Sequence, residues 1–221
     1  MRMWIVTVFV ATFVRLTCVV PCYSQSVLAE QSFDPKPANE LYGFDEARPR
    51  QFFHRNIKTS LQSYYQYLAI SYCFSRHYVA LPGFEGYFRS VSEMERQNAD
   101  KLVAYLMKRG MTYDFASISV NDKFIQCYER DDSDVTAWSY VMKVVDFLLA
   151  DQKDRLDKFK KTHTAAVLNN FPHLKHFIED GFLDQKYLKI KEVAEMKTQL
   201  ERIRANENSE LGLFTFDRSL A

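Results

Sequence analysis

The chain has 221 residues, of which 47% are hydrophobic and 26% are charged, so it is long enough for one domain with a sizeable core. Only six glycines and six prolines are present, and this scarcity favours helices over a turn-rich β fold. The formal net charge of +1 excludes a strongly basic or acidic protein, so composition gives no reason to expect nucleic acid or an anionic membrane as partner.

The N-terminal segment has the pattern of a secretory signal. Arg2 precedes an apolar run over residues 3–14, and small residues follow further along. We therefore predict a signal peptide over 1–24, an irregular extension over 25–45, and a secreted mature chain. A membrane anchor is the alternative, although the apolar run is shorter than the roughly 20 residues that a membrane span needs.

Residues 46–221 contain four long helical patterns, in which apolar residues recur at alternating steps of three and four. The predicted helices run over about 47–75, from Pro82 to a stop at Gly110, from an Asp134 cap to about Asn169, and from Pro172 to a break at 206–209. A short apolar tail follows. The connection over 111–132 must cross the length of the bundle, so we expect the second and third helices to be parallel. The predicted fold is all-α, a four-helix bundle with one long crossover and a short fifth helix.

Polar residues stand near the middle of all four inward-facing stripes. They are Ser60 and Tyr67 on the first helix, Glu95 and Asn98 on the second, Gln152 on the third, and Lys186, preceded by an inward Leu183, on the fourth. A buried carboxylate is costly unless it is paired or bound to metal, so the stripes predict one shared polar pocket. Bundle metalloproteins place Glu-x-x-His pairs there, whereas this chain reads Glu95-x-x-Asn98. A metal site and a hydrogen-bonded core with Lys186 near Glu95 both remain open.

Two of the four cysteines, Cys18 and Cys22, would be removed with the predicted signal. Cys73 lies in a helical apolar pattern, where we prefer to interpret it as a small core residue. Cys127 lies in the long connection. An intersubunit disulfide through one of these two is the alternative in an oxidising compartment.

Four stretches of the chain resemble the ferritin family, over about residues 47–221. They are SYYQYLAISYCFSR, LPGFEGYFRSVSEMERQNADKLVAYLMKRG, HLKHFIEDGFLDQKYLKIKEVAEM and ELGLFTFDRSL. The signal and the LPGF and LVAYLMKRG stretches are most similar to secreted, heavy-chain-type ferritin subunits of arthropods. The resemblance implies an iron-storage cage of twenty-four subunits, homo- or heteropolymeric, with iron as ligand and other ferritin subunits as partners.

The resemblance also implies a depleted iron-oxidation site. Heavy-type subunits oxidise ferrous iron inside the bundle, on glutamates, a histidine, a tyrosine and a glutamine. Tyr67 and Glu95 match this set, while the other ligand positions fall on Ser60, Asn98, Gln152 and Lys186. Two ferrous ions need several hard oxygen or imidazole donors. The resemblance therefore implies a remnant metal site of Glu95, Tyr67 and Gln152 with low iron occupancy and no catalytic residues.

Lys186 is interpreted as a substitute for the missing metal, which lowers the pKa of the Glu95 carboxyl by the opposite-charge effect. The alternative is weak ferroxidase activity through Tyr67, Glu95 and Gln152 with water ligands. A second alternative is a secreted helical bundle that neither forms a cage nor stores iron, although the apolar tail argues against it.

Two further metal-binding sets follow from the resemblance alone. His163, His176 and Glu179 match a channel on the threefold axis of the family's cage, where carboxylates attract iron, and Lys175 opposes that attraction. Glu93 matches one of the positions at which light-type subunits nucleate mineral. It is the only acidic residue among the positions of this chain that match them.

Overall fold

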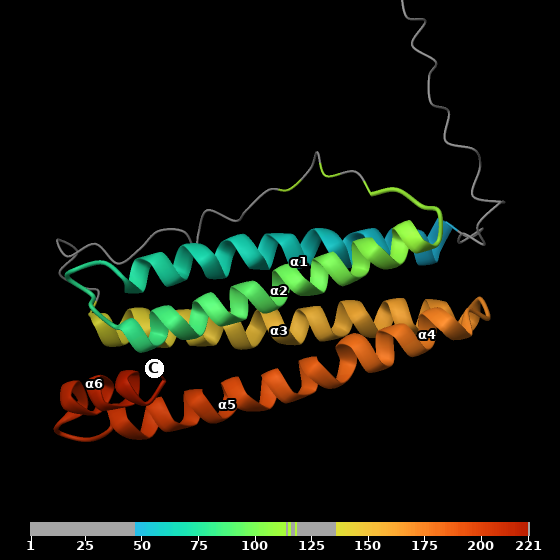
Figure 1. Cartoon of the computed structure of the whole chain (residues 1–221). Coiled ribbons are helices and arrows are strands. Elements are labelled where there is room, and N and C mark those ends of the chain that lie inside the picture. Colours follow the sequence, from blue (N-terminus) through green and yellow to red (C-terminus); the bar gives the residue numbers. More distant parts are fainter. Residues whose placement is uncertain (1–46, 114, 116–117, 119–135, 221) are drawn as a thin grey trace, which may run out of the picture. The chain divides into compact units, whose positions relative to one another are not determined.

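The computed structural model describes residues 47–113, 115, 118 and 136–220, which form an all-α bundle (Figure 1). Its elements are α1 (Ala47–Phe74), α2 (Pro82–Lys108), α3 (Ala137–Leu168), α4 (Pro172–Ile178), the π-helical segment η3 (Glu179–Leu183), α5 (Asp184–Arg204) and α6 (Ser209–Ser219). The predicted fold class is confirmed. The predicted signal, the N-terminal extension, Cys127 and Asp134 lie outside the described residues. Within the described ranges, no helix is long and apolar enough to cross a membrane.

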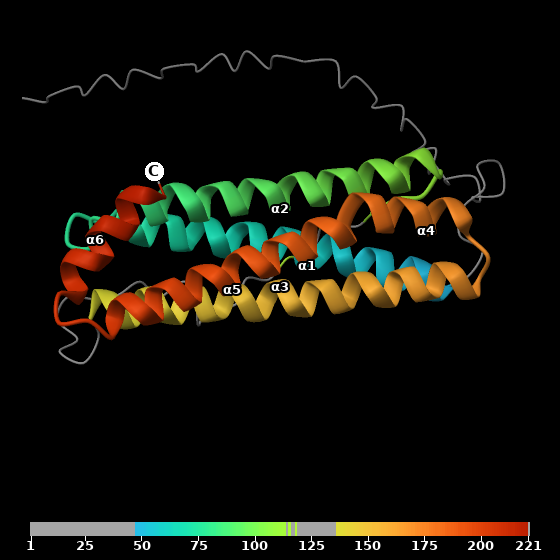
Figure 2. The same ribbon diagram turned by 90° about the horizontal axis from the view of Figure 1, so that it is seen from below.

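The helix directions follow from contacts between the long helices. Asn56 bonds to Thr162 at 2.7 Å, whereas Ser63, further along α1, bonds to Asp151, earlier in α3, at 2.9 Å. α1 is therefore antiparallel to α3. Because α1 and α2 form an antiparallel hairpin, α2 and α3 run in the same direction, as Figures 1 and 2 show. The prediction of a long crossover between the second and third helices is thus confirmed.

The core consists of two apolar clusters at opposite ends of the bundle. One gathers aromatic rings from the hairpin and the start of α3, among them Phe74, Phe84, Phe88 and Tyr140. The other gathers rings from the opposite ends of the helices, among them Phe53, Tyr105, Phe159 and Phe182. The polar residues predicted from the stripes lie between these clusters, so apolar side chains flank them on both sides.

The starts of α2 and α4 match the prediction, whereas α3 begins with a different cap from the predicted one. Pro82 and Pro172 open α2 and α4 as predicted, because a first-turn proline lacks only an N–H that the helix does not use. The cap of α3 is Thr136, not Asp134. The Thr136 hydroxyl accepts from the Ser139 N–H at 3.2 Å, and the Ser139 hydroxyl accepts from the Thr136 N–H at 2.9 Å. This reciprocal pair satisfies two otherwise unpaired donors.

The π-helical segment η3 keeps the inner face of the fourth helix in register. The residues Leu174, Ile178, Phe182 and Lys186 are all buried, at successive steps of four. In a regular α-helix with 3.6 residues per turn, Lys186 would be rotated by about 120° from Leu174. The wider π turn absorbs the extra residue and returns Lys186 to the core. Phe182, not the predicted Leu183, therefore takes the buried position before it.

The C-terminal helix α6 is attached to the start of α2. The Asp217 carboxylate is buried, and its Oδ1 accepts from the Phe84 N–H at 2.9 Å. It thereby caps a helix that lacks a side-chain cap of its own. Gly83 permits the contact, because a Cβ there would lie 1.8 Å from the Asp217 carbonyl oxygen. Leu211 and Phe214 on α6 remain exposed.

Gly83→Ala is expected to destabilise the protein by about 1–3 kcal/mol, because the added methyl group would overlap backbone atoms of α6. Gly86→Ala is the matched control. It lies one turn further along α2, and a Cβ there would meet nothing within 4 Å. This control should be neutral or stabilising by up to about 1 kcal/mol, since alanine favours the helix. Thermal unfolding of both variants checks the difference, and equal melting temperatures would contradict the close approach of α6.

Cys73 is fully buried in the first apolar cluster and is disulfide-bonded. The preferred interpretation of Cys73 as a small core residue is confirmed, and the disulfide is an additional bond that this interpretation did not include. Its partner cysteine lies outside the described residues. Disulfides form and persist in oxidising compartments, so this bond is relevant to the predicted secretion of the chain.

Candidate functional site

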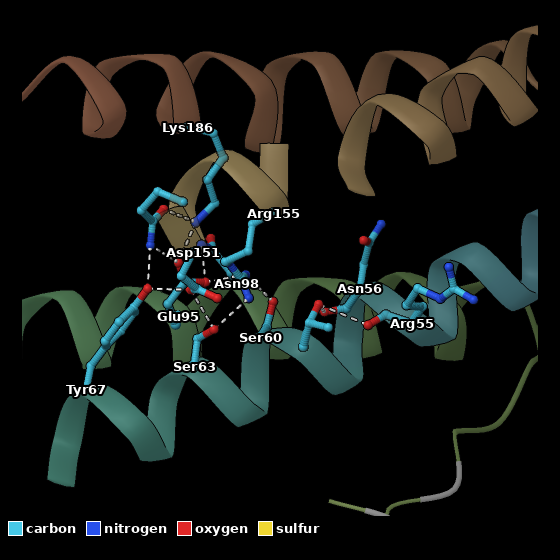
Figure 3. Close-up of polar contacts among 12 residues, drawn as sticks. Arg55, Asn56, Ser60, Ser63, Tyr67, Glu95, Asn98, Asp151, Arg155 and Lys186 are labelled. Carbon is cyan, nitrogen blue, oxygen red and sulfur yellow. Dashed lines mark hydrogen bonds and ion pairs between the residues drawn. The ribbon is translucent and has the colours of Figure 1, made fainter. Parts of the chain in front are cut away.

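The six polar residues predicted from the stripes meet in one buried cluster at mid-bundle, and Figure 3 labels all of them except Gln152. Each side chain is completely inaccessible to solvent. The contributing residues are Ser60 and Tyr67 from α1, Glu95 and Asn98 from α2, Gln152 from α3 and Lys186 from α5. The structure therefore brings together every member of the predicted pocket.

The Glu95 carboxylate is the centre of this cluster, and both of its oxygens are occupied. Oε1 accepts from the Lys186 ammonium and from the Gln152 amide, the latter at 3.2 Å. Oε2 accepts from the Arg155 guanidinium and from the Asn98 amide, the latter at 3.3 Å. Each oxygen thus carries one cation and one neutral donor, which satisfies the pairing that a buried carboxylate requires.

Arg155 is a member of the cluster that the sequence analysis missed. It is 1% exposed, and its Nη2 donates to Glu95 and to the Ser60 hydroxyl, the latter at 2.7 Å. Its Nη1 donates to the Ser63 hydroxyl at 3.2 Å. Arg155 lies in the run DQKDRLDKF, whose many charges are typical of a solvent-exposed helix face, so its burial is not evident from the sequence. Its position three residues after Gln152 was the available signal, because residues three apart share a helix face.

Asp151 is a second carboxylate that the sequence analysis missed, at the half-buried edge of the cluster. It accepts hydrogen bonds from the Tyr67 hydroxyl and from the Ser63 hydroxyl. The Gln152 amide connects it to the centre, since its nitrogen donates to the Tyr67 oxygen at 3.1 Å and its carbonyl accepts from Lys186 at 2.8 Å. With Arg155, Lys186 and Glu95, Asp151 makes a cluster of two cations and two carboxylates with no net charge.

The pKa directions in the cluster follow from burial and from these neighbours. Burial raises the pKa of the Glu95 carboxyl, but Arg155 and Lys186 outweigh burial and bring it to about 2. Burial lowers the pKa of the Lys186 ammonium to about 8, although Glu95 partly opposes the shift. Burial and the neighbouring Asp151 raise the pKa of Tyr67 well above its ordinary value. Glu95 is therefore ionised and Tyr67 neutral at neutral pH.

Acid should remove the stabilisation that Glu95 provides. Its pKa is lowered on folding from 4.5 to about 2, so the unfolded chain binds the proton more tightly. The contribution, about 3 kcal/mol, is fully present above pH 4.5 and is lost as pH falls from 4.5 to 2. In urea unfolding between pH 7 and 3, wild type should lose stability faster than Glu95→Gln. Parallel pH curves for the two proteins would contradict the lowered pKa.

The donors of the cluster fit a pair of divalent cations poorly. Glu95 is its only fully buried carboxylate, and Arg155 and Lys186 already bind both of its oxygens. In the part of the chain that the structure describes, no three His, Cys, Asp or Glu side chains are arranged to hold a metal ion. Hard divalent cations prefer several oxygen or imidazole ligands, and two neighbouring cationic side chains repel them.

The predicted channel residues lie together where α3 ends and η3 begins. The His163 Nε2 is 2.7 Å from Oε1 of Glu179, and the His176 Nδ1 is 3.9 Å from Oε2. The Lys175 ammonium is 3.8 Å from the same carboxylate. The hydrogen bond to His163 is the main cause of a lowered pKa at Glu179. The carboxylate is therefore shared among three basic side chains.

The predicted nucleation residue, Glu93, lies on the surface of α2 and is already paired. Its two carboxylate oxygens accept from the Arg96 guanidinium at 2.6 and 2.8 Å, and the Gln97 amide donates at 3.1 Å. Arg96 also contacts Asp100 at 2.6 Å. These bonds bring the pKa of Glu93 to about 2. The carboxylate is engaged within its own helix.

Comparisons with known proteins are consistent with this architecture. The sequence profile of the family described as ferritin, with a ferritin-like domain, matches residues 51–206. A curated relative, the soma ferritin of Lymnaea stagnalis, is 30% identical over 165 residues. The alignment covers 75% of this chain and 86% of the relative.

Proposed function

The chain belongs to the ferritin family, and from that premise we propose that it is an iron-storage subunit that supplies shell structure rather than oxidation chemistry. Iron is its cargo, and other ferritin subunits are its partners. In this proposal the chain assembles into a cage of twenty-four subunits, together with active heavy-type subunits that oxidise the ferrous iron.

The observation that carries this proposal is the occupation of Glu95 by two cationic side chains. Ferrous ions would have to displace Arg155 and Lys186 from the carboxylate, and both cations would remain buried beside the incoming metal. Their displacement would also leave buried charges unpaired, which costs several kcal/mol. Fast iron oxidation at this position is therefore disfavoured by the same contacts that stabilise the core.

Secretion belongs to the same proposal and has two supports. One is the predicted signal over residues 1–24. The other is the disulfide at Cys73, because disulfides are rare in reducing compartments. If the signal is removed with Cys18 and Cys22, Cys127 is the remaining partner within the chain.

Assembly and iron access complete the proposal. The exposed Leu211 and Phe214 give α6 an apolar outer face, which is suited to contacts with neighbouring subunits. We assign the cluster of His163, His176 and Glu179 to the route by which iron crosses the shell. The support for this assignment is the match to the family's channel positions; within the chain, His163 and Lys175 already contact the Glu179 carboxylate, and Lys175 opposes a cation there electrostatically.

The decisive test is the mass and iron content of the particle purified from its native source, measured by light scattering and elemental analysis. The proposal expects a particle of about twenty-four ferritin-sized subunits, in which this chain accompanies a heavy-type subunit and the iron exceeds the number of subunits. A monomer or dimer without iron would overturn it, and would favour a secreted bundle that does not store iron.

A further inference from the structure

We propose that Arg155 and Lys186 each close a separate half of the polar cluster, so that Arg155 independently prevents a metal ion from binding between α1 and α2. The inference rests on the proposed function and deepens it, because it identifies Arg155 as the residue that determines whether this half can open. Arg155 is not one of the positions that correspond to metal ligands in the family. Restoring those ligands alone would therefore leave its half closed.

The half between α1 and α2 is filled by the Arg155 guanidinium. Its Nη2 donates to Glu95 and, at 2.7 Å, to Ser60. Its Nη1 donates to Ser63 at 3.2 Å. Asn98 donates to the same Glu95 oxygen that Arg155 binds. The guanidinium thus lies among Ser60, Glu95 and Asn98, three of the positions where a ligand would have to reach a metal.

The half between α3 and α5 is filled by the Lys186 ammonium. It donates to the other Glu95 oxygen and to the Gln152 carbonyl, the latter at 2.8 Å. Figure 3 shows the two cationic side chains approaching the Glu95 carboxylate, which joins the halves. One carboxylate bridging two cations is the charge arrangement of a two-metal site, with an organic cation in each place.

The two halves of the polar cluster differ in how firmly their cationic side chain is held in the place of a metal ion. The planar fork of arginine fixes the direction of several hydrogen bonds, and Arg155 donates to Glu95, Ser60 and Ser63. Lysine is a compact charge on a flexible stem, and Lys186 donates to Glu95 and Gln152. The Arg155 half is therefore the more firmly closed, and removing Lys186 cannot open it.

The test compares metal occupancy in assembled, iron-free proteins soaked with Zn²⁺ and located by anomalous diffraction. The first variant combines Ser60→Glu, Asn98→His, Gln152→Glu and Lys186→Gln, and retains Arg155. The second adds Arg155→Val. We expect no core ion in wild type, one ion beside residue 152 in the first variant, and two in the second. Diffraction separates these ions from any bound by surface histidines.

Two core ions in the first variant would overturn the inference, as would one ion or none in the second. The matched control is Arg155→Lys on the same four-substitution background, which retains a cation and should retain the single ion. If the five-substitution variant does not fold, Gln152→Glu with Lys186→Gln alone should bind one ion. Ser60→Glu with Asn98→His alone should bind none until Arg155→Val is added. Two core ions in wild type would instead overturn the proposed function, so the two failures are distinguishable.

Discussion

Replacing Glu95 by glutamine is expected to lower the free energy of unfolding by about 3–5 kcal/mol, because it removes the anion from a buried ion pair. Glutamine has nearly the same shape, so the change is electrostatic rather than a loss of packing. Arg155 and Lys186 would remain buried beside each other, with Asp151 as the nearby carboxylate. Denaturation at matched protein concentration checks the effect, after light scattering has established the oligomeric state, since association stabilises the folded subunit.

Lys186→Met is the matched control for this substitution. It removes one of the two cations while Glu95 keeps Arg155, so no buried charge is left without a partner. Replacing a buried charged group by an apolar group of similar size is often neutral or stabilising. We expect Lys186→Met to lie within about 1.5 kcal/mol of wild type. Equal losses in the two variants would show that packing, not the charge of Glu95, determines the stability of the cluster.

The assembled protein made from this chain alone should oxidise ferrous iron no faster than the same buffer does without protein. The reason is the occupation of both Glu95 oxygens and the scarcity of metal donors around them. Oxygen consumption and absorbance of the ferric product, followed after rapid mixing of anaerobic ferrous iron with aerated protein, measure the rate. A heavy-type ferritin at equal subunit concentration is the positive control.

Glu95→Ala provides the internal comparison for this result. If the cluster does no oxidation chemistry, the variant should match wild type in rate, provided that it still assembles. Rapid oxidation by wild type, in proportion to the number of subunits and abolished in the variant, would contradict the proposal. It would show instead that Tyr67, Glu95 and Gln152 still bind iron.

The positions of the polar cluster could be predicted because helical periodicity fixes which residues face inward. Ser60, Glu95 and Lys186 interrupt otherwise apolar stripes, and an interruption on every helix indicates a shared site. The spacing from Gln152 indicates the face of Arg155 but not its burial, because its burial depends on a carboxylate supplied by another helix. Sequence periodicity shows on which face of its helix a residue lies. Only the tertiary structure shows which group from another helix pairs with a buried charge and makes its burial tolerable.

The same distinction explains the other corrections. The cap of α3 was assigned to Asp134 from residue type, whereas Thr136 has both a suitable side chain and Ser139 at the correct spacing. Leu183 was placed inward because a regular α-helix was assumed, and the π turn moves Phe182 into that position. For Cys73, burial was predicted correctly, but a sequence does not show which cysteines meet in space.

The cluster of Arg155, Lys186, Glu95 and Asp151 has no net charge before any metal binds. Folding of the subunit therefore does not depend on the supply of iron. A site that needs metal to neutralise its carboxylates is complete only after loading, and chelators can strip it. Here the balancing charges are covalent parts of the chain, present as soon as it is synthesised. The centre of the subunit should therefore be identical in iron-starved and iron-replete tissue, so the subunit can be made before iron is supplied.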